Sequence, residues 1–398
     1  MYPLLTLKPG KEVPLRAGHP WVFSEGIAVA PSGLTPGSLV EVQSLHGETL
    51  GMGSFHPNQS IAVRMYDKNV VALDADWFAK RISSLASWKR ALLPNDTDGF
   101  RVVHAENDGI PGVILDLYRD VAVFQIHTAG ADLLRDALIE GITQALNPRA
   151  IVERSDVAAR RQEGLALREP TVCAGTISEP VPFSEAGLTF LADVLHGQKT
   201  GFFLDQRQAR LAVGRLAKGK RVLNLFSYSG AFSVHVLNGG ATHVTSVDVS
   251  LPALEAAEAA FKLNGFDDPQ DELIDLMQAD VLDLIEDPEW KAHADLIVCD
   301  PPAFAKTDRD REGALKMYTH LNEACLRQLQ PGGILVTSSC SGRVTPEDFR
   351  MMLRIASGRA QKRVRLLQWI GHDTDHAELL TYPEGRYLKT AILLVEPE

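Results

Sequence analysis

Residues 221–250 constrain the fold of this 398-residue chain more strongly than any other stretch. The apolar run Val222–Phe226 predicts a short buried strand, and the letters S-Y-S-G after it predict a turn. A helix is expected to begin at Ala231, and a second strand at His243–Val249 places Asp248 at its carboxyl end. This strand–turn–helix–strand order is typical of a parallel sheet, whose strands hold ligands at their carboxyl ends.

The turn between these strands bears on which ligand the sheet holds. An acidic residue at the position of Asp248 typically accepts hydrogen bonds from the ribose hydroxyls of an adenosine-type cofactor. A dinucleotide site expects the pattern G-x-G-x-x-G around its pyrophosphate, whereas this turn offers Gly230 alone among bulky residues. One glycine allows the close approach of a compact cofactor, so we favour S-adenosylmethionine over a dinucleotide. A βαβ unit without any ligand stays open on this stretch alone.

The alternation of strands and helices continues to the end of the chain. A helix is expected at 251–263, and further strands at 273–278, 294–299, 333–338, 364–370 and 388–395. Together they predict an α/β domain with a doubly wound sheet. The strand ends at Phe226, Asp248, Asp280 and Asp300 would converge on one crevice, and three of these four residues are acidic. Acids at three strand ends favour a ligand site over an ordinary βαβ unit.

Two smaller domains are expected before the doubly wound one. Residues 1–73 form short strand-like segments separated by glycine, proline and asparagine turns, which predicts a β-rich module. Residues 74–180 combine a helix at 74–93, several strands and a helix at 131–146 into an α+β domain. The third domain covers residues 181–398.

Some residues of the two smaller domains are candidates for particular roles. Trp21 and Phe23 are expected to anchor the core of the first domain, with a stacking surface as the alternative. In the second domain, Arg154, Arg160 and Arg161 are weak candidates for contacts with phosphate.

Composition bears on location and on partners. The hydrophobic fraction is 45%, yet no run of about 18 apolar residues predicts a membrane span, and the N-terminus lacks the layout of a signal peptide. A cytoplasmic location is therefore expected. The net charge of −11 disfavours broad binding of polyanions, so a nucleic acid would need a local basic patch. Residues 350–365 offer one, although a solvated helix face accounts for it equally well.

The cysteines and histidines show no spacing typical of a metal or redox site. The four cysteines are far apart, without a C-x-x-C pair, and no metal is expected. Cys299 and Cys325 fall within a strand and a helix and are expected in the core.

Two strand ends carry residues that suggest chemistry on a base. The letters C-D-P-P-A-F follow one strand, and Asp-Pro-Pro makes a rigid turn that can present Asp300 to the edge of a planar base. Phe304 could stack on that base. After the next strand stands Cys340, whose thiolate could attack an electron-poor ring carbon. Carbon 5 of cytosine becomes nucleophilic only after such an addition at carbon 6.

Several of these stretches together resemble a known family. They are K-T-G-F-F-L-D-Q-R, N-L-F-S-Y-S-G-A-F, S-V-D-V-S, C-D-P-P-A-F, S-S-C-S-G and T-Y-P-E-G-R-Y-L-K. In this order they resemble the large-subunit ribosomal RNA cytosine-5 methyltransferases that carry an N-terminal PUA domain, and G-H-P-W-V-F-S resembles that PUA domain. The resemblance spans nearly the whole chain.

The resemblance implies a PUA-like RNA-binding domain, a central α+β domain and a C-terminal Rossmann-like methyltransferase domain that uses S-adenosylmethionine. It implies that Cys340 attacks carbon 6 of a cytosine in ribosomal RNA while Asp300 hydrogen-bonds the ring. It also implies a set of contact residues. Those for the cofactor are Phe203, Asp205, Arg207, Asn224, Phe226, Ser227, Tyr228, Gly230, Asp248, Val249, Ser250, Asp280, Val281, Asp300 and Pro301, and those for the base are Pro302, Phe304 and Lys306.

Other functions stay open on the sequence. Many RNA members of the wider cytosine-5 group have a second cysteine where this chain has Ala303, so another group must take the carbon-5 proton. A relative of similar layout methylates a guanine nitrogen, and a small-molecule acceptor is a further alternative. A binding protein without catalysis is disfavoured by Asp300 and Cys340, and a nicotinamide dehydrogenase by the missing glycines. A homodimer is also an expectation.

Overall fold

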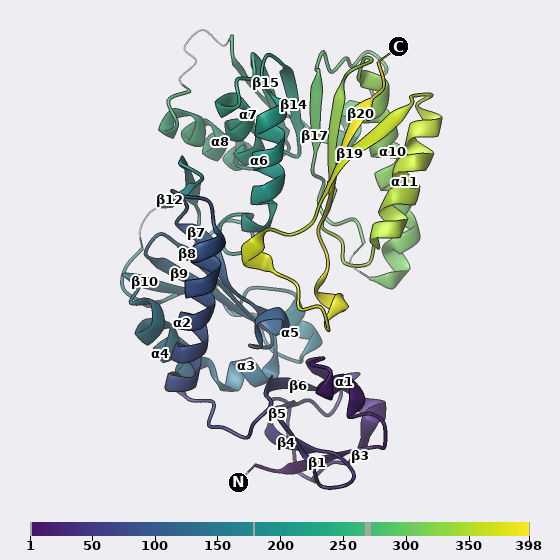
Figure 1. Cartoon of the computed structure of the whole chain (residues 1–398). Coiled ribbons are helices and arrows are strands. Elements are labelled where there is room, and N and C mark those ends of the chain that lie inside the picture. The colour runs from purple at the N-terminus through teal and green to yellow at the C-terminus, as the bar shows by residue number, and fades with distance from the viewer. Residues whose placement is uncertain (1, 178–179, 267–271, 306, 398) are drawn as a thin grey trace. The chain divides into compact units, whose positions relative to one another are not determined.

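The computed structural model describes residues 2–177, 180–266, 272–305 and 307–397 (Figure 1). The chain divides into two compact units. The first comprises Met1–Ala186, Leu191–Leu204 and Thr374–Gly385, and the second Gly187–Phe190, Asp205–Asp373 and Arg386–Glu398. The three domain ranges given above stay a prediction.

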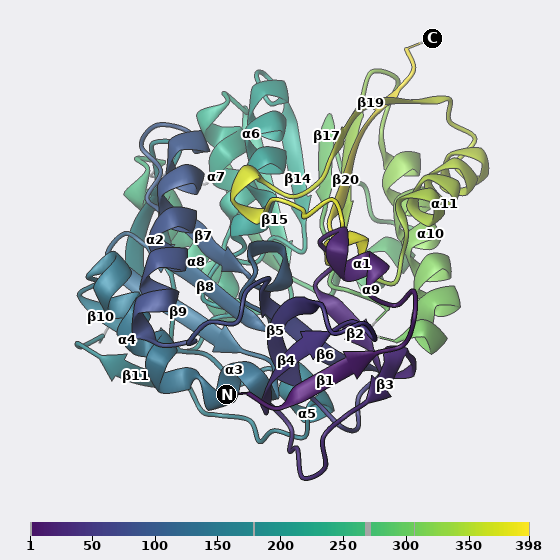
Figure 2. The ribbon, with the colours of Figure 1, turned by 60° about the horizontal axis from the view of Figure 1, so that its bottom comes forward.

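The first unit begins with a six-stranded sheet of short strands, which Figure 2 shows together. Its strand order is β2-β6-β5-β4-β1-β3, and the only parallel pair is β1 with β4 among the pairings of the described residues. Alternate residues such as Leu5 and Leu7, or Val40 and Val42, are buried, as expected for strands with one face on a core. The elements are β1 (Leu4–Leu7), α1 (Val13–Arg16), β2 (Trp21–Phe23), β3 (Ile27–Val29), β4 (Leu39–Gln43), β5 (Thr49–Phe55) and β6 (Ile61–Asp67).

The same unit contains a five-stranded sheet in the order β11-β10-β9-β8-β7. Strands β7, β8 and β9 are buried along their whole length, and α2 and α4 contribute to the same core. The helix expected at 131–146 is interrupted at Leu134, whose φ of −96° and ψ of 11° are not helical, and Thr128 caps the separate short helix before it. The elements are α2 (Ala75–Leu92), β7 (Gly99–His104), β8 (Val113–Tyr118), β9 (Val121–Ile126), α3 (Ala129–Leu133), α4 (Arg135–Leu146), β10 (Ala150–Glu153), α5 (Ala159–Gln162) and β11 (Thr171–Ala174).

Two expectations for this unit are wrong. The ring of Phe23 is 40% exposed rather than in the core, because β2 has only three residues and turns Phe23 outward. Arg160 is a structural residue, since it is 2% exposed and donates to Asp132 and to the carbonyls of Ile126 and Ala166.

The second unit is built on a seven-stranded sheet in the order β16-β15-β14-β17-β18-β20-β19. All neighbours pair in parallel except β20, which is antiparallel to β18 and β19. The α/β class with a doubly wound sheet is confirmed. The elements are α6 (Arg207–Leu216), β14 (Arg221–Leu225), α7 (Ala231–Asn238), β15 (His243–Asp248), α8 (Leu251–Leu263), β16 (Ile274–Gln278), α9 (Val281–Glu286), β17 (Leu296–Cys299), α10 (Arg311–Gln328), β18 (Ile334–Ser339), α11 (Pro346–Arg359), β19 (Val364–Ile370) and β20 (Lys389–Val395). A separate two-stranded sheet, β12 (Val181–Glu185) with β13 (Leu188–Ala192), precedes it along the chain.

The strand order reverses beside β14. The chain runs outward from β14 through β15 to β16, and then returns to add β17 on the other side of β14. In sheets of this kind the crevice that binds ligands lies at such a reversal, outside the carboxyl ends of the strands. The turns after β14 and β17 are therefore the places to look for a site.

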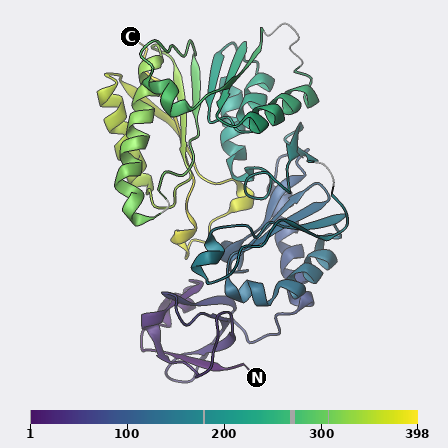
Figure 3. The same cartoon turned by 180° about the vertical axis from the view of Figure 1, so that it is seen from behind.

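The main core of the second unit lies between the sheet and the helices α10 and α11, which lie side by side (Figures 1 and 3). Cys299 and Cys325 are 0% exposed in this core, as the sequence predicts. Within the described residues, no helix is long and apolar enough to cross a membrane, and no group of three or more His, Cys, Asp or Glu side chains is placed to hold a metal ion.

Gly230 tests how tightly the turn after β14 packs. Its φ is +70°, and a Cβ there would lie 2.7 Å from the Cβ of Ala257 on α8. We expect Gly230→Ala to lower the free energy of unfolding by about 1–3 kcal/mol, through both strain and overpacking. The control is Gly313→Ala in α10, where a Cβ meets nothing within 4 Å. Urea denaturation measures both, and equal stabilities of the two variants would contradict the assignment.

Candidate active site

The turn after β14 has an unusual backbone. Phe226, Tyr228 and Gly230 all have positive φ, at +59°, +46° and +70°. Bulky residues seldom adopt this conformation, and backbone strain of this kind is common at ligand-binding sites. The turn is held by hydrogen bonds from Ser227 N to the carbonyl of Val247, at 2.9 Å, and from Gly230 N to the carbonyl of Ser227, also at 2.9 Å.

Asp248, at the end of β15, is the side chain that fastens this turn. Its two carboxylate oxygens accept hydrogen bonds from the backbone N–H groups of Tyr228, at 2.8 Å, and Ser250, at 2.9 Å. The carboxylate is half-buried, and each oxygen keeps a second lone pair. It is therefore held in one orientation and can still accept hydrogen bonds from two hydroxyls of a ligand.

Other polar atoms near the turn lack a protein partner. Among the described residues, the hydroxyls of Ser227 and Ser229 are buried and make no hydrogen bond, and the same holds for Oε1 of Gln206 and Oδ1 of Asn224. Buried polar atoms nearly always have a partner, so the two serine hydroxyls of this turn indicate that a polar molecule completes them. A cofactor with a ribose and an amino-acid moiety suits this set.

Gly230 also has a packing role, which the sequence does not show. Its missing side chain leaves room for Ala257 and Phe261 of α8, rather than for a ligand. The positive φ and the packing of α8 account for a glycine here, and its backbone can still face a cofactor.

Asp300 follows β17 and is held by a residue that sequence reasoning missed. Gln206 Nε2 donates to both carboxylate oxygens of Asp300, at 3.0 and 3.1 Å. The neighbouring Asp205 accepts a hydrogen bond from the Tyr387 hydroxyl at 2.7 Å. Gln206 and Tyr387 both stand inside stretches that carry the family resemblance, which was the available signal.

Cys340 lies one residue beyond β18, and its side chain is half-buried. The parallel register pairs Cys299 with Thr337, so the ends of β17 and β18 lie beside each other. The Ser341 hydroxyl donates to the carbonyl of Ala305 at 2.8 Å, which joins the turn that carries Cys340 to the turn that carries Asp300.

Tyr318 of α10 lies within electrostatic range of both groups. Burial, and after it the negative charges of Cys340 and Asp300, raise the pKa of Tyr318 to about 12. Its ring is 4.8 Å from that of Phe304, between centroids. Tyr318 is therefore a neutral phenol near pH 7 that packs against the predicted stacking residue Phe304.

Other predicted site residues have mainly structural contacts. Arg207 is fully buried and paired with Asp373, and Asn224 donates to Ser233 at 2.9 Å. Asp280 is exposed and caps α9 through a hydrogen bond from Leu282 N at 2.8 Å.

The remaining residues predicted to contact the cofactor or the base differ in burial and in location. Val249 is 65% exposed and Val281 is 2% exposed, while Pro301 is buried and Pro302 exposed. Phe203 belongs to the first unit, where Lys199 Nζ lies 4.3 Å from its ring centroid. Lys306 lies outside the described residues.

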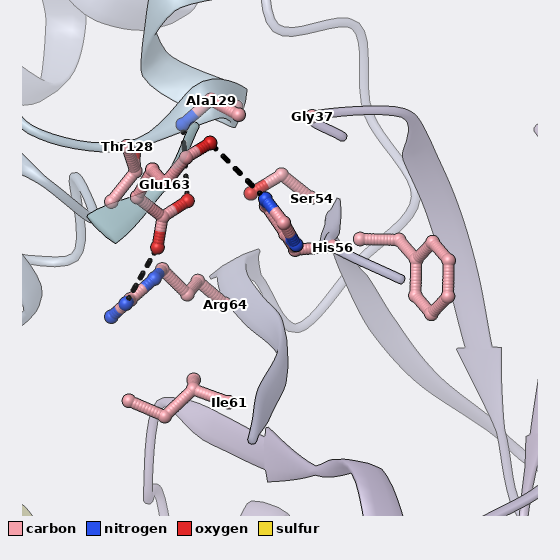
Figure 4. A pocket seen from close by; sticks show the side chains of 10 residues that line it. Gly37, Ser54, His56, Ile61, Arg64, Thr128, Ala129 and Glu163 are labelled. Carbon is pink, nitrogen blue, oxygen red and sulfur yellow. Dashed lines mark hydrogen bonds and ion pairs between the residues drawn. The ribbon is translucent and has the colours of Figure 1, made fainter. Parts of the chain in front are cut away.

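A hollow lies in the first unit, between β5, β6 and the start of α3 (Figure 4). Glu163 is its central group, because Arg64 donates to it at 3.2 Å and the Ala129 N–H at 3.3 Å. His56 Nε2 lies 3.2 Å from the carbonyl oxygen of Glu163. These groups already satisfy one another, so we assign this hollow to packing rather than to a ligand.

Comparison with known proteins shows the family of the chain. Residues 142–359 match the family model described as S-adenosylmethionine-dependent methyltransferase, and residues 5–68 match a PUA-like domain. The chain is 36% identical to ribosomal RNA large subunit methyltransferase I of Klebsiella pneumoniae (strain 342), covering 98% of this chain and 97% of that protein. Identity to the protein of the same name from Shewanella denitrificans is 38%, over 98% of this chain and 99% of the relative.

Solved structures share the fold. A Streptococcus mutans protein described as a SAM-dependent methyltransferase aligns with a TM-score of 0.82 at 24% identity, over 99% of this chain and all of that one. A methyltransferase solved with SAH aligns with a TM-score of 0.84, also at 24% identity. The family models and the relatives confirm a PUA-like domain joined to a methyltransferase domain, and S-adenosylmethionine as the cofactor.

Asp248 offers a test of the cofactor site by binding alone. We expect Asp248→Asn to weaken S-adenosylmethionine binding about 10- to 100-fold, because an amide supplies one acceptor where the carboxylate supplies two. Isothermal titration calorimetry measures the affinity. The control is Asp275→Asn on the neighbouring strand β16, where the carboxylate is exposed beside His243. Unchanged affinity in Asp248→Asn would show that the ligand lies elsewhere.

Proposed function

We propose, from the premise that the chain belongs to the S-adenosylmethionine-dependent methyltransferase family, that it methylates carbon 5 of a cytosine in large-subunit ribosomal RNA. The relatives at 36% and 38% identity carry the name ribosomal RNA large subunit methyltransferase I, and they align with this chain over nearly their whole length. The match to a PUA-like domain supports an RNA acceptor. The choice of cytosine rests on the side chains at the ends of β17 and β18.

The observation that supports this choice is that Cys340 and Asp300 follow the ends of two adjacent parallel strands, β18 and β17. The Ser341 hydroxyl joins their two turns through a hydrogen bond of 2.8 Å to the carbonyl of Ala305. Methylation of an exocyclic amine or a ring nitrogen needs no sulfur nucleophile, whereas carbon 5 of cytosine does. A half-buried cysteine beside an acidic group at a strand end therefore favours the carbon-5 reaction.

The chain's own residues would act in sequence on the base. The Cys340 thiolate adds to carbon 6 and forms a sulfur–carbon bond, while the electron pair of the 5,6 double bond moves into the ring and makes carbon 5 nucleophilic. Asp300, oriented by Gln206, hydrogen-bonds the ring and favours this addition. When bound, S-adenosylmethionine supplies the electrophilic methyl group. A base then removes the carbon-5 proton, the double bond re-forms, and the carbon–sulfur pair returns to Cys340.

The residues proposed to hold the cofactor are those around the strained turn. Asp248 accepts from ribose hydroxyls, and Ser227 and Ser229 supply the hydroxyls that lack a protein partner among the described residues. Asp205, Arg207, Asn224 and Asp280 stay proposals whose contacts here are with the protein itself.

Replacement of the nucleophile tests the covalent route. We expect Cys340→Ala to lower methyl transfer to ribosomal RNA by at least about 1,000-fold while S-adenosylmethionine binding changes little, because the thiol serves the base and not the cofactor. Tritium transfer to RNA and calorimetry give the two readouts. The control is Cys173→Ala, a half-buried cysteine of the first unit. Activity retained in Cys340→Ala would overturn the covalent route.

A mechanism-based trap separates cytosine from other acceptors. In RNA that contains 5-fluorocytosine, carbon 5 carries fluorine in place of the proton, so release is blocked and the protein should remain attached through Cys340. A band that resists denaturing electrophoresis and disappears in Cys340→Ala is the expected result. Methyl transfer to such RNA without any adduct would instead favour a guanine nitrogen as the acceptor.

A further inference from the structure

A buried lysine lies directly beneath the turn that carries Cys340. Lys389 is the first residue of β20, where it pairs with Ser339, the last residue of β18. Its side chain is 4% exposed, and its ammonium group donates to the carbonyls of Ser341, at 2.6 Å, and Val344, at 2.7 Å. These two bonds hold both ends of the segment that follows Cys340.

A lysine in this position is costly, so its charge needs an explanation. Burying an ammonium group removes its hydration, and backbone carbonyls return only part of that energy. Burial lowers the pKa of Lys389 to about 8, while the charges of Cys340 and Asp348 raise it. The group is therefore mostly protonated at pH 7. A methionine would avoid this cost, so a lysine at this position calls for a role of its charge.

We propose that Lys389 is a positioning residue for the nucleophile: it fixes the turn at Ser341 and Val344, and its positive charge stabilises the thiolate form of Cys340. The inference rests on the proposed function, since only a covalent route needs a thiolate. The negative charge of Cys340 stabilises the protonated form of Lys389. The same interaction energy stabilises the thiolate form of Cys340, because the coupling between two charges is mutual.

Other charged and titratable groups face the same region. Tyr318 lies on α10 and stays neutral near pH 7, and Asp300 acts on it from the end of β17. Asp348 on α11 helps to keep Lys389 protonated, while its own carboxylate is held by Arg311 and by the Thr345 cap. Arg343 is exposed in the turn itself. Lys389 is the buried cation of this set.

The pH profile of Cys340 alkylation tests the proposal without any use of activity. Iodoacetamide reacts with the thiolate, and mass spectrometry of the Cys340 peptide follows its modification from pH 5.5 to 10. We expect Lys389→Met to move the midpoint up by about one pH unit or more, with about tenfold slower alkylation at pH 7. Lys389→Arg, which keeps the charge, should stay within about 0.3 units of the wild type.

A second buried lysine provides the control. Lys89 in the first unit is 0% exposed and paired with Asp108, so Lys89→Met also removes a buried charge, but far from Cys340 along the chain. A Cys340 midpoint that stays unchanged in folded Lys389→Met, or that moves equally in Lys89→Met, would overturn the proposal. If Lys389→Met fails to fold, the alkylation midpoint of Cys340 in the wild-type protein tests the proposal instead. Its Cys340 midpoint should lie below that of the same thiol in guanidinium, and a higher midpoint overturns the proposal.

These outcomes stay separate from those for the reaction itself. Full activity in Cys340→Ala removes the covalent route but leaves the alkylation profile as a valid measurement of the lysine's charge. Loss of activity in Cys340→Ala with an unshifted profile in Lys389→Met keeps the nucleophile and removes the role of Lys389.

Discussion

The parallel pairing of β14 with β15 on one side and β17 on the other is the constraint on which the site depends. It brings the carboxyl ends of three strands to one edge, although β14 ends at Leu225, β15 at Asp248 and β17 only at Cys299. The turn after β14, the carboxylate of Asp248 and the Asp-Pro-Pro turn are each unremarkable alone. The sheet makes them neighbours, because hydrogen-bonded strands hold their ends in register.

Strain and incomplete hydrogen bonding occur together at this edge. Two bulky residues of one turn adopt a left-handed backbone, and two buried serine hydroxyls beside them lack a protein partner within the described chain. Each feature lowers the stability of the protein without ligand. Their coincidence is what a preorganised cofactor site requires, since a turn that relaxed onto its own side chains would leave no acceptors or donors for a ligand.

The turn after β18, at the proposed reaction centre, is also held by contacts from other parts of the fold. The Ser341 hydroxyl donates to the turn after β17, and the ammonium group of Lys389 donates to the carbonyls of Ser341 and Val344. The backbone that carries Cys340 is thus fixed by contacts from two other elements. A nucleophile held in this way loses little entropy when it meets its target, which is the advantage of placing it between strands rather than in a free loop.

Apolar periodicity and the glycine and proline turns were enough to predict the α/β class, most strands of the seven-stranded sheet, and the burial of Cys299 and Cys325, because these are local properties of the chain. Short strands such as β1, β3 and β11 carry too few residues for a periodic signal. The sequence also marked Asp248, Asp300 and Cys340, but it could not show that Gln206 holds Asp300, that Lys389 lies beneath Cys340, or that Arg207 pairs with Asp373. Gln206 and Asp300 are 94 positions apart in the sequence, and Arg207 and Asp373 are 166 positions apart. Lys389 is 45 to 48 positions from the carbonyl groups that it contacts. Only the packing of the folded sheet and its helices decides them, since no local rule relates side chains at such separations.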